Sequence, residues 1–145
     1  MPVSPPTRLG CCLALLVWST WPTLSFAADP PWRRHTIDAA DRAAGKRGAD
    51  GVRLADVNGD GRLDVTTGWE QGGAIRVCVN PGPAAARKPW PAVTVGTVRS
   101  PEDAVFADLD GDGRLDVVSS CEGKTRSIFV HWAPKDRSRL RDPGA

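Results

Sequence analysis

Two short segments of this 145-residue chain carry polar oxygen-bearing side chains at alternate positions, interrupted by glycine. Residues 56–64 read DVNGDGRLD, and residues 108–116 read DLDGDGRLD. In each segment, side-chain oxygens occupy positions 1, 3, 5 and 9, and glycines occupy positions 4 and 6. These oxygens can converge on one point only if the chain curls tightly, and glycine permits the positive φ angles that such a curl requires.

The chemistry of these side chains favours a calcium ion. Three or four carboxylates held close together repel one another unless a cation lies among them. All the side-chain donors are hard oxygen atoms, and neither His nor Cys occurs at ligand spacing, which predicts Ca²⁺ rather than zinc or copper. At position 7 we expect the backbone carbonyls of Arg62 and Arg114 to point inwards and their side chains to point outwards. The alternative is a pair of solvated Asp-Gly turns that bind no ion.

Each segment begins like an EF-hand loop and then departs from that pattern. An EF-hand requires a bidentate Glu at position 12. Position 12 is here Thr67 in the first segment and Ser119 in the second, and the flanking residues favour strands rather than helices. The sequence therefore predicts two calcium loops of another kind, each set between β-strands.

The two loops belong to a longer internal repeat. Upstream of the loops, Pro31-Trp32 recurs as Pro89-Trp90, and apolar strand-like runs recur downstream. One unit spans about 31–88 and the second about 89–134, followed by a polar connector at 135–145. A repeat period of about 50 residues is typical of propellers and other repeat arrays.

Short β-branched runs bounded by Gly, Pro, Asn and Asp predict an all-β fold. We expect four strands in each unit and hairpin turns at Gly72-Gly73 and Gly123-Lys124. A β-propeller blade is a four-stranded sheet, so four strands in each unit predict that each unit is one blade. The expected strands are 34–37, 52–56, 63–67 and 74–79 in the first unit, and 92–98, 104–108, 115–119 and 127–132 in the second.

The pattern A-D-[VL]-[ND]-G-D-G-R-L-D-V resembles the FG-GAP/VCBS repeat, and the resemblance covers about 31–134. It implies calcium-loaded blades of an integrin-α-like propeller of the kind found in secreted bacterial proteins. The Phe-Gly and Gly-Ala-Pro signatures of the family are not visible, so the likeness is to the VCBS-like branch. The ligands that the resemblance implies are Asp56, Asn58, Asp60, the Arg62 carbonyl and Asp64, and Asp108, Asp110, Asp112, the Arg114 carbonyl and Asp116.

Two blades cannot close a propeller, because a ring takes typically four to eight. The polar residues 135–145 contain no counterpart of Pro89-Trp90. We therefore expect the chain to be an incomplete propeller: a fragment or truncated product of a longer one. The alternative is self-association of open two-blade pieces.

The first 27 residues have the layout of a secretory signal peptide. Arg8 precedes an apolar run at 9–18, and Ser25-Phe26-Ala27 places small residues around a cleavage site. The run is too short to span a bilayer, which predicts a secreted or periplasmic protein. An uncleaved anchor is the alternative. The remaining cysteines, Cys78 and Cys121, fall at unmatched positions of the repeats, so we expect buried free thiols rather than a disulfide.

The function that these observations favour is a calcium-binding propeller module that serves recognition or acts as a scaffold, with an unknown protein or glycan partner. The nearly balanced charge, 19 Lys and Arg against 17 Asp and Glu, does not favour nucleic-acid or anionic-membrane binding. The alternative is a secreted propeller enzyme, a polysaccharide hydrolase or lyase. The candidate catalytic residues of such an enzyme are His35, His131 and Ser119-Ser120. Trp69 and Trp132 are the candidate contact aromatics, and Trp32 and Trp90 are expected to pack between blades.

Overall fold

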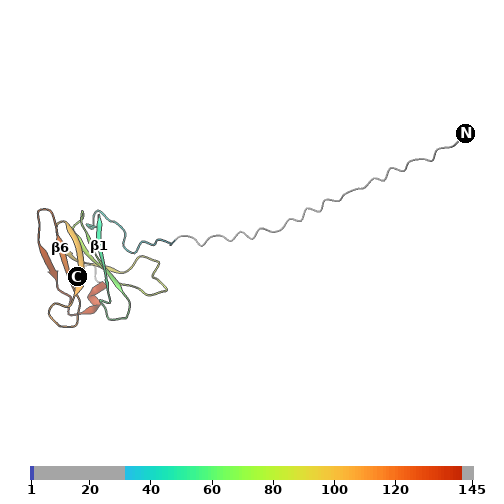
Figure 1. Ribbon diagram of the computed structural model, residues 1–145. Helices are drawn as coiled ribbons and strands as arrows, with labels where there is room; N and C mark the ends of the chain where they lie inside the picture. The colour runs from blue at the N-terminus through green and yellow to red at the C-terminus, as the bar shows by residue number, and fades with distance from the viewer. Residues whose placement is uncertain (2–31, 142–145) are drawn as a thin grey trace. The chain divides into compact units, whose positions relative to one another are not determined.

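A computed structural model of the chain describes Met1 and residues 32–141 (Figure 1). The predicted signal peptide at 1–27, with Cys11 and Cys12, lies outside the described residues apart from Met1. All the strands belong to one compact unit that begins at Arg34. Among the residues described, there is no helix of the length and apolarity needed to cross a membrane.

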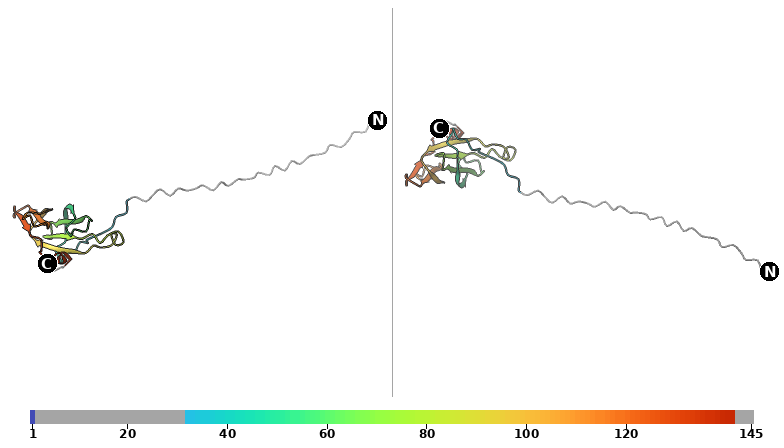
Figure 2. Two further views of the ribbon diagram at one scale, coloured as in Figure 1. Left: turned by 90° about the horizontal axis from the view of Figure 1, so that it is seen from below. Right: turned by 90° about the horizontal axis from the view of Figure 1, so that it is seen from above.

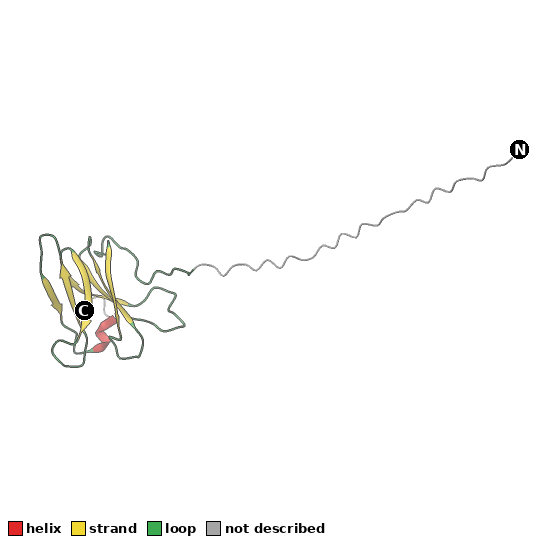
Figure 3. Ribbon diagram, in the orientation of Figure 1, coloured by secondary structure: helices red, strands yellow, loops and turns green. Residues whose placement is uncertain are grey.

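The unit is all-β and contains two antiparallel sheets, as the sequence predicts. The first sheet has the order β1-β2-β3-β4, and the second has the order β5-β6-β7. Figure 3 shows the strands of both sheets with the short 3₁₀ turn η1 (Arg137–Arg141) beside them. The strands are β1 Ala49–Ala55, β2 Asp64–Trp69, β3 Ala74–Cys78, β4 Ala92–Thr97, β5 Pro101–Ala107, β6 Asp116–Cys121 and β7 Ile128–His131.

Two features of the strand prediction are wrong. Residues 34–37 form no strand, and β4, which we expected to open the second unit, instead pairs with β3 as the outer strand of the first sheet. The first sheet therefore has four strands and the second has three among the described residues. Repetition in a sequence indicates where strands recur, but it contains no information on which neighbour a strand will pair with.

The hydrophobic core lies between the two sheets. Ile75 and Val77 of β3 are fully buried beside Val93 of β4, and Ala104 and Val117 meet them from the second sheet. Burying a Val or Ile side chain contributes about 1.5–3 kcal/mol. In Figure 2, the orange strands of the second sheet lie to one side of the green and yellow strands of the first.

The first strands of the two sheets, β1 and β5, approach closely near their starts. Gly51 has a φ of 56°, and a Cβ atom at this position would collide with the Asp103 carboxylate. Arg53 Nη2 donates to Asp103 Oδ2 at 2.5 Å and forms an ion pair between the two sheets. Both strands also carry a register shift at the corresponding position, between Asp50 and Val52 and between Pro101 and Asp103.

Residues 135–141 fold back onto the two sheets. Leu140 of η1 is 7% exposed and belongs to the core cluster. Asp136 Oδ1 accepts a hydrogen bond from Ser138 N at 2.9 Å, which caps the turn. The composition of 135–141 predicts only a polar connector, because a single apolar side chain among charged neighbours gives no periodic signal.

Of the four tryptophans outside the predicted signal peptide, Trp32 and Trp69 differ in exposure from what the sequence predicts. Trp32 is fully exposed rather than packed, and Trp69 is only 6% exposed, so Trp69 is not a surface contact residue. Trp90 is half-buried and donates from Nε1 to the Ala86 carbonyl at 3.0 Å. Trp132 is 62% exposed, as a contact residue requires.

Cys78 and Cys121 are both buried free thiols, as the unmatched spacing predicts. Burial raises the pKa of the Cys78 thiol to about 12. Because the thiolate is the reactive form, Cys78 is chemically inert at neutral pH.

Candidate metal centre

The two acidic segments are the turns that join the first two strands of each sheet. Loop 1 (56–64) connects β1 to β2, and loop 2 (108–116) connects β5 to β6. The four loop glycines all have positive φ angles, as the predicted curl requires, and a side chain would be strained at each of them. These angles are 77° at Gly59, 80° at Gly61, 76° at Gly111 and 79° at Gly113.

The carboxylate at position 1 organises each loop by accepting backbone amides. In loop 1, Asp56 Oδ1 accepts from Gly59 N at 2.7 Å, and Oδ2 accepts from Gly61 N at 2.7 Å. In loop 2, Asp108 makes the same two contacts with Gly111 N and Gly113 N, at 2.8 and 3.0 Å. Hydrogen bonds from Gly61 above all, and from Asp60 and Gly59, hold the pKa of the Asp56 carboxyl below its ordinary value.

The side chains at positions 3 and 5 continue the curl. Asn58 Oδ1 accepts from Asp60 N at 3.0 Å, and Asp110 Oδ1 accepts from Asp112 N at 3.2 Å. Each position-5 carboxylate then accepts the amide of the position-7 arginine, at 3.0 Å in loop 1 and 2.9 Å in loop 2. The backbone thus follows the same path twice, which a solvated turn of arbitrary conformation would not require.

In loop 2 three carboxylates converge. Asp108, Asp110 and Asp112 each offer a carboxylate oxygen, and these oxygens lie within 4.8 Å of one another. Calcium binds oxygen at 2.3–2.6 Å, so two ligands on opposite sides of one ion are about 5 Å apart. The spacing and the hard-oxygen donors both fit Ca²⁺. Asn58 replaces the second carboxylate in loop 1 and offers a neutral amide oxygen, which Ca²⁺ also accepts.

The aspartates at position 9 of the two loops are buried, unlike the side chains at positions 1, 3 and 5. Asp64 is fully buried and Asp116 is 3% exposed. Asp64 accepts from Val57 N at 2.9 Å and from Asn80 N at 2.7 Å, while Asp116 accepts from Leu109 N at 3.2 Å and from Ala133 N at 2.8 Å. Each carboxylate therefore ties its loop to the end of the third strand of its sheet. Burial raises the pKa of Asp64, and the amides of Asn80 and Val57 oppose that rise.

The arginine side chains at position 7 fold back onto their loops instead of pointing outwards, so that expectation is wrong. Arg62 pairs with the Asp60 carboxylate and Arg114 pairs with the Asp112 carboxylate. Opposite charges two residues apart attract across the turn, and Arg62 Nε also donates to the Asn80 carbonyl at 3.3 Å. An ion that binds at position 5 therefore competes with a guanidinium in each loop.

A second acidic cluster lies at the opposite end of the strands. Glu70 follows β2, Glu122 follows β6 and Glu102 lies near the start of β5, and their carboxylate oxygens lie within 4.8 Å of one another. Sequence alignment of the units pairs Glu70 with Glu122 but does not predict that the two meet. The packing of the two sheets brings them together, and we name these three residues the hairpin-end cluster.

The structure brings together one serine and one histidine that the sequence does not connect. Ser119 Oγ lies 2.9 Å from His131 Nε2. The register of β6 and β7 places His131 opposite Val117. Ser119 lies two residues after Val117 in β6, so its side chain is on the same face of the sheet and is the diagonal neighbour of His131. Ser119 is fully buried, and the His131 ring packs against Gly96. A substrate cannot reach this hydroxyl, so the pair serves packing.

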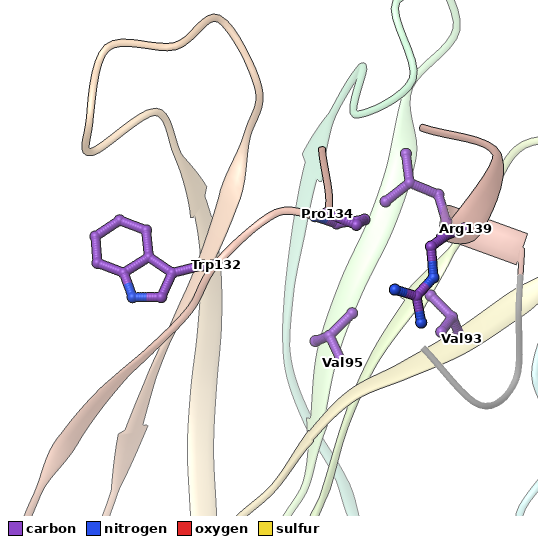
Figure 4. Close-up of a pocket in the computed structure, with 6 residues that line it drawn as sticks. Val93, Val95, Trp132, Pro134 and Arg139 are labelled. Carbon is purple, nitrogen blue, oxygen red and sulfur yellow. The ribbon is translucent and has the colours of Figure 1, made fainter. Parts of the chain in front are cut away.

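An apolar groove lies between the outer strands of the two sheets. It encloses about 270 Å³ and is lined by Val93, Val95, Trp132, Pro134, Arg139 and Leu140. Figure 4 shows Trp132 on one side of this groove and Val93, Val95 and Arg139 on the other. The exposed indole gives the groove a flat aromatic wall.

Comparison with known families identifies the repeat. A family described as FG-GAP-like repeat matches residues 56–119. Residues 56–119 are an FG-GAP-like repeat. The match begins at the first residue of loop 1 and ends within β6, so it includes both loops and the four strands β2, β3, β4 and β5. No curated protein and no solved structure matches the chain.

Proposed function

We propose that this protein is an exported, calcium-binding β-propeller repeat module that serves recognition or scaffolding and is not a catalyst. The observation that carries the proposal is the convergence of Asp108, Asp110 and Asp112 within 4.8 Å, on a loop whose backbone path recurs at 56–64. The FG-GAP-like repeat at 56–119 supports the same function.

Each loop would hold one Ca²⁺ through side-chain and backbone oxygens. The ligands that we propose for loop 1 are Asp56, Asn58, Asp60, the Arg62 carbonyl and Asp64; those for loop 2 are Asp108, Asp110, Asp112, the Arg114 carbonyl and Asp116. Asp64 and Asp116 already accept two amides each, but a carboxylate oxygen has a second lone pair with which it can bind a cation. When bound, the ion neutralises the repulsion among the carboxylates and ties the ends of two strands together.

Thermal unfolding with and without calcium tests this proposal. Extracellular calcium modules bind with a Kd on the order of 10⁻⁴–10⁻³ M. At 100 times the Kd, one occupied site adds about 2.7 kcal/mol to the free energy of unfolding, which raises the Tm of a domain of this size by about 10 °C. EDTA should reverse this rise and Mg²⁺ at the same concentration should not reproduce it. An identical melting curve in Ca²⁺ and EDTA would refute the metal sites.

Export through the N-terminal signal peptide is the localisation that we propose. It rests on the arrangement of Arg8, the apolar run at 9–18 and the small residues before Ala28. Expression in a secreting host followed by mass spectrometry should recover a periplasmic or extracellular chain that begins at Ala28. A cell-associated chain that retains residues 1–27 would favour the uncleaved anchor.

The surface around Trp132 is the part of the molecule that we propose contacts a partner. Trp132 is 62% exposed on the groove and directly follows β7, whose first residue, Ile128, is 75% exposed. A protein or glycan partner would use this surface, and self-association of two copies would use it in the same way. Trp132→Ala should weaken binding to a partner found on glycan or peptide arrays by about 30-fold, the effect of a hot-spot residue. Trp32→Ala, which removes an equally large exposed indole elsewhere, is the matched control.

A further inference from the structure

One arginine contacts both loops at once. Arg137 Nη1 donates to the Asn58 carbonyl at 3.1 Å, and Arg137 Nη2 donates to the Gly113 carbonyl at 3.2 Å. Asn58 lies in loop 1 and Gly113 lies in loop 2, so the two ends of one guanidinium connect loops that belong to different sheets. The planar, forked arrangement of its donors suits a guanidinium to such a bridge.

The position of Arg137 does not depend on these two hydrogen bonds. It is the first residue of η1, whose backbone is capped by Asp136, and Leu140 of the same turn is buried in the core. A small recess beside this turn is lined by Val57 of loop 1 and Leu115 of loop 2. The apolar side chains of both loops and of η1 therefore pack together, and this packing presents the guanidinium to both loops.

The two carbonyls that accept from Arg137 belong to residues that shape the candidate ligand sets. Asn58 is itself a proposed ligand, and its side chain accepts the amide of Asp60. Gly113 donates its amide to Asp108 Oδ2 at 3.0 Å while its carbonyl accepts from Arg137. Fixing either carbonyl therefore restricts the backbone that orients the carboxylates of that loop.

We propose that Arg137 couples the two calcium loops, so that filling one loop increases the affinity of the other for Ca²⁺. This inference rests on the proposed function. An ion in loop 1 orders the Asn58 carbonyl, which fixes Arg137 and through it the Gly113 carbonyl of loop 2. Loop 2 then loses less conformational entropy when it binds its own ion. Coupling between two sites is reciprocal, so loop 2 affects loop 1 by the same factor.

A double-mutant cycle on the whole chain tests the coupling. Asp60→Ala disables loop 1 and Asp112→Ala disables loop 2, and each is combined with Arg137→Gln. A Ca²⁺ titration followed by NMR at the amides of Gly61 and Gly113 reports the two loops separately. Disabling one loop should weaken the other about fivefold, at the lower end of the usual range for coupled sites. In the Arg137→Gln background the same change should leave the other loop unaffected.

The cycle separates the coupling from the positive charge of Arg137. That charge repels an ion in either loop taken singly, so its effect cancels when the two backgrounds are compared. Arg139→Gln is the matched control, because Arg139 lies in the same turn and, among the described residues, is not bonded to either loop. Coupling in that variant should equal coupling in the unchanged chain.

The possible results distinguish this inference from the proposed function. If both loops bind Ca²⁺ and the affinity of each is independent of the other, the calcium sites stand and the coupling is wrong. Coupling that persists in Arg137→Gln also overturns the role of this residue. If neither amide responds to Ca²⁺, the proposed function fails and the coupling fails with it.

Discussion

Carboxylates cluster at both ends of the strands, but their surroundings shift the carboxyl pKa in opposite directions. At the loop end, backbone amides satisfy Asp56 and lower its pKa, and guanidinium groups pair with Asp60 and Asp112. At the hairpin end, burial, a hydrogen bond with Glu122 and the nearby charges of Asp50 and Glu70 raise the pKa of Glu102. The surroundings of Asp56 thus favour its anionic form, whereas the surroundings of Glu102 disfavour the anion.

The number of acidic residues therefore does not by itself define a cation site. The loops contain glycines whose amides turn towards the carboxylates, so a negative charge is stabilised before any ion arrives. The hairpin-end cluster has an oxygen spacing similar to that of loop 2 but no such arrangement of amides among the contacts of the described residues. Three predictions test whether this comparison holds.

The largest effect is expected at the buried carboxylates beneath the loops. Asp64→Ala leaves the amides of Val57 and Asn80 without their charged acceptor in the interior. We expect the free energy of unfolding to fall by about 3 kcal/mol or more, measured by urea denaturation in EDTA so that no metal contributes. Glu122→Ala at the hairpin end should leave stability unchanged or raise it. Equal losses at both ends would contradict the comparison.

Calcium should distinguish the two ends with a slightly smaller effect. Asp112→Ala should abolish the stabilisation due to loop 2, about 2.7 kcal/mol at 100 times the Kd, while Glu70→Ala should leave the response to Ca²⁺ intact. Calorimetric titration of each variant measures the number of ions bound. A reduced number in Glu70→Ala would show that the hairpin-end cluster binds an ion as well.

The smallest effect is a dependence on pH at the hairpin end. The pKa of Glu102 is raised in the folded chain above its ordinary value of 4.5. The folded state therefore binds the proton more tightly, so the contribution of Glu102 to stability is complete below pH 4.5 and is lost as the pH rises through the folded pKa. Glu102→Gln should remove this dependence and increase stability at neutral pH. Urea denaturation at pH 4, 5, 6 and 7 measures it, and parallel curves for the two proteins would show that Glu102 is not the group responsible.

The backbone curl of the two acidic loops could be predicted almost completely from the sequence, because it is local. Asp56 and Gly61 are five residues apart, and the bond between them depends only on the curl that the glycines permit. The same holds for Asp108 and Gly113. The predicted outward direction of the Arg62 and Arg114 side chains is wrong, because each guanidinium is attracted by a carboxylate two residues away.

By itself, the sequence determined the strands around the loops, the loop geometry and the all-β class, since alternation and turn chemistry act over a few residues. Only the tertiary structure decided which sheet β4 joins, that Trp69 is buried, that Ser119 meets His131, and that the three glutamates of the hairpin end converge. It also decided that Arg137 reaches both loops across separations of 79 and 24 residues. These contacts depend on how two sheets pack, and packing is settled by the summed burial of side chains from all the strands rather than by any one segment.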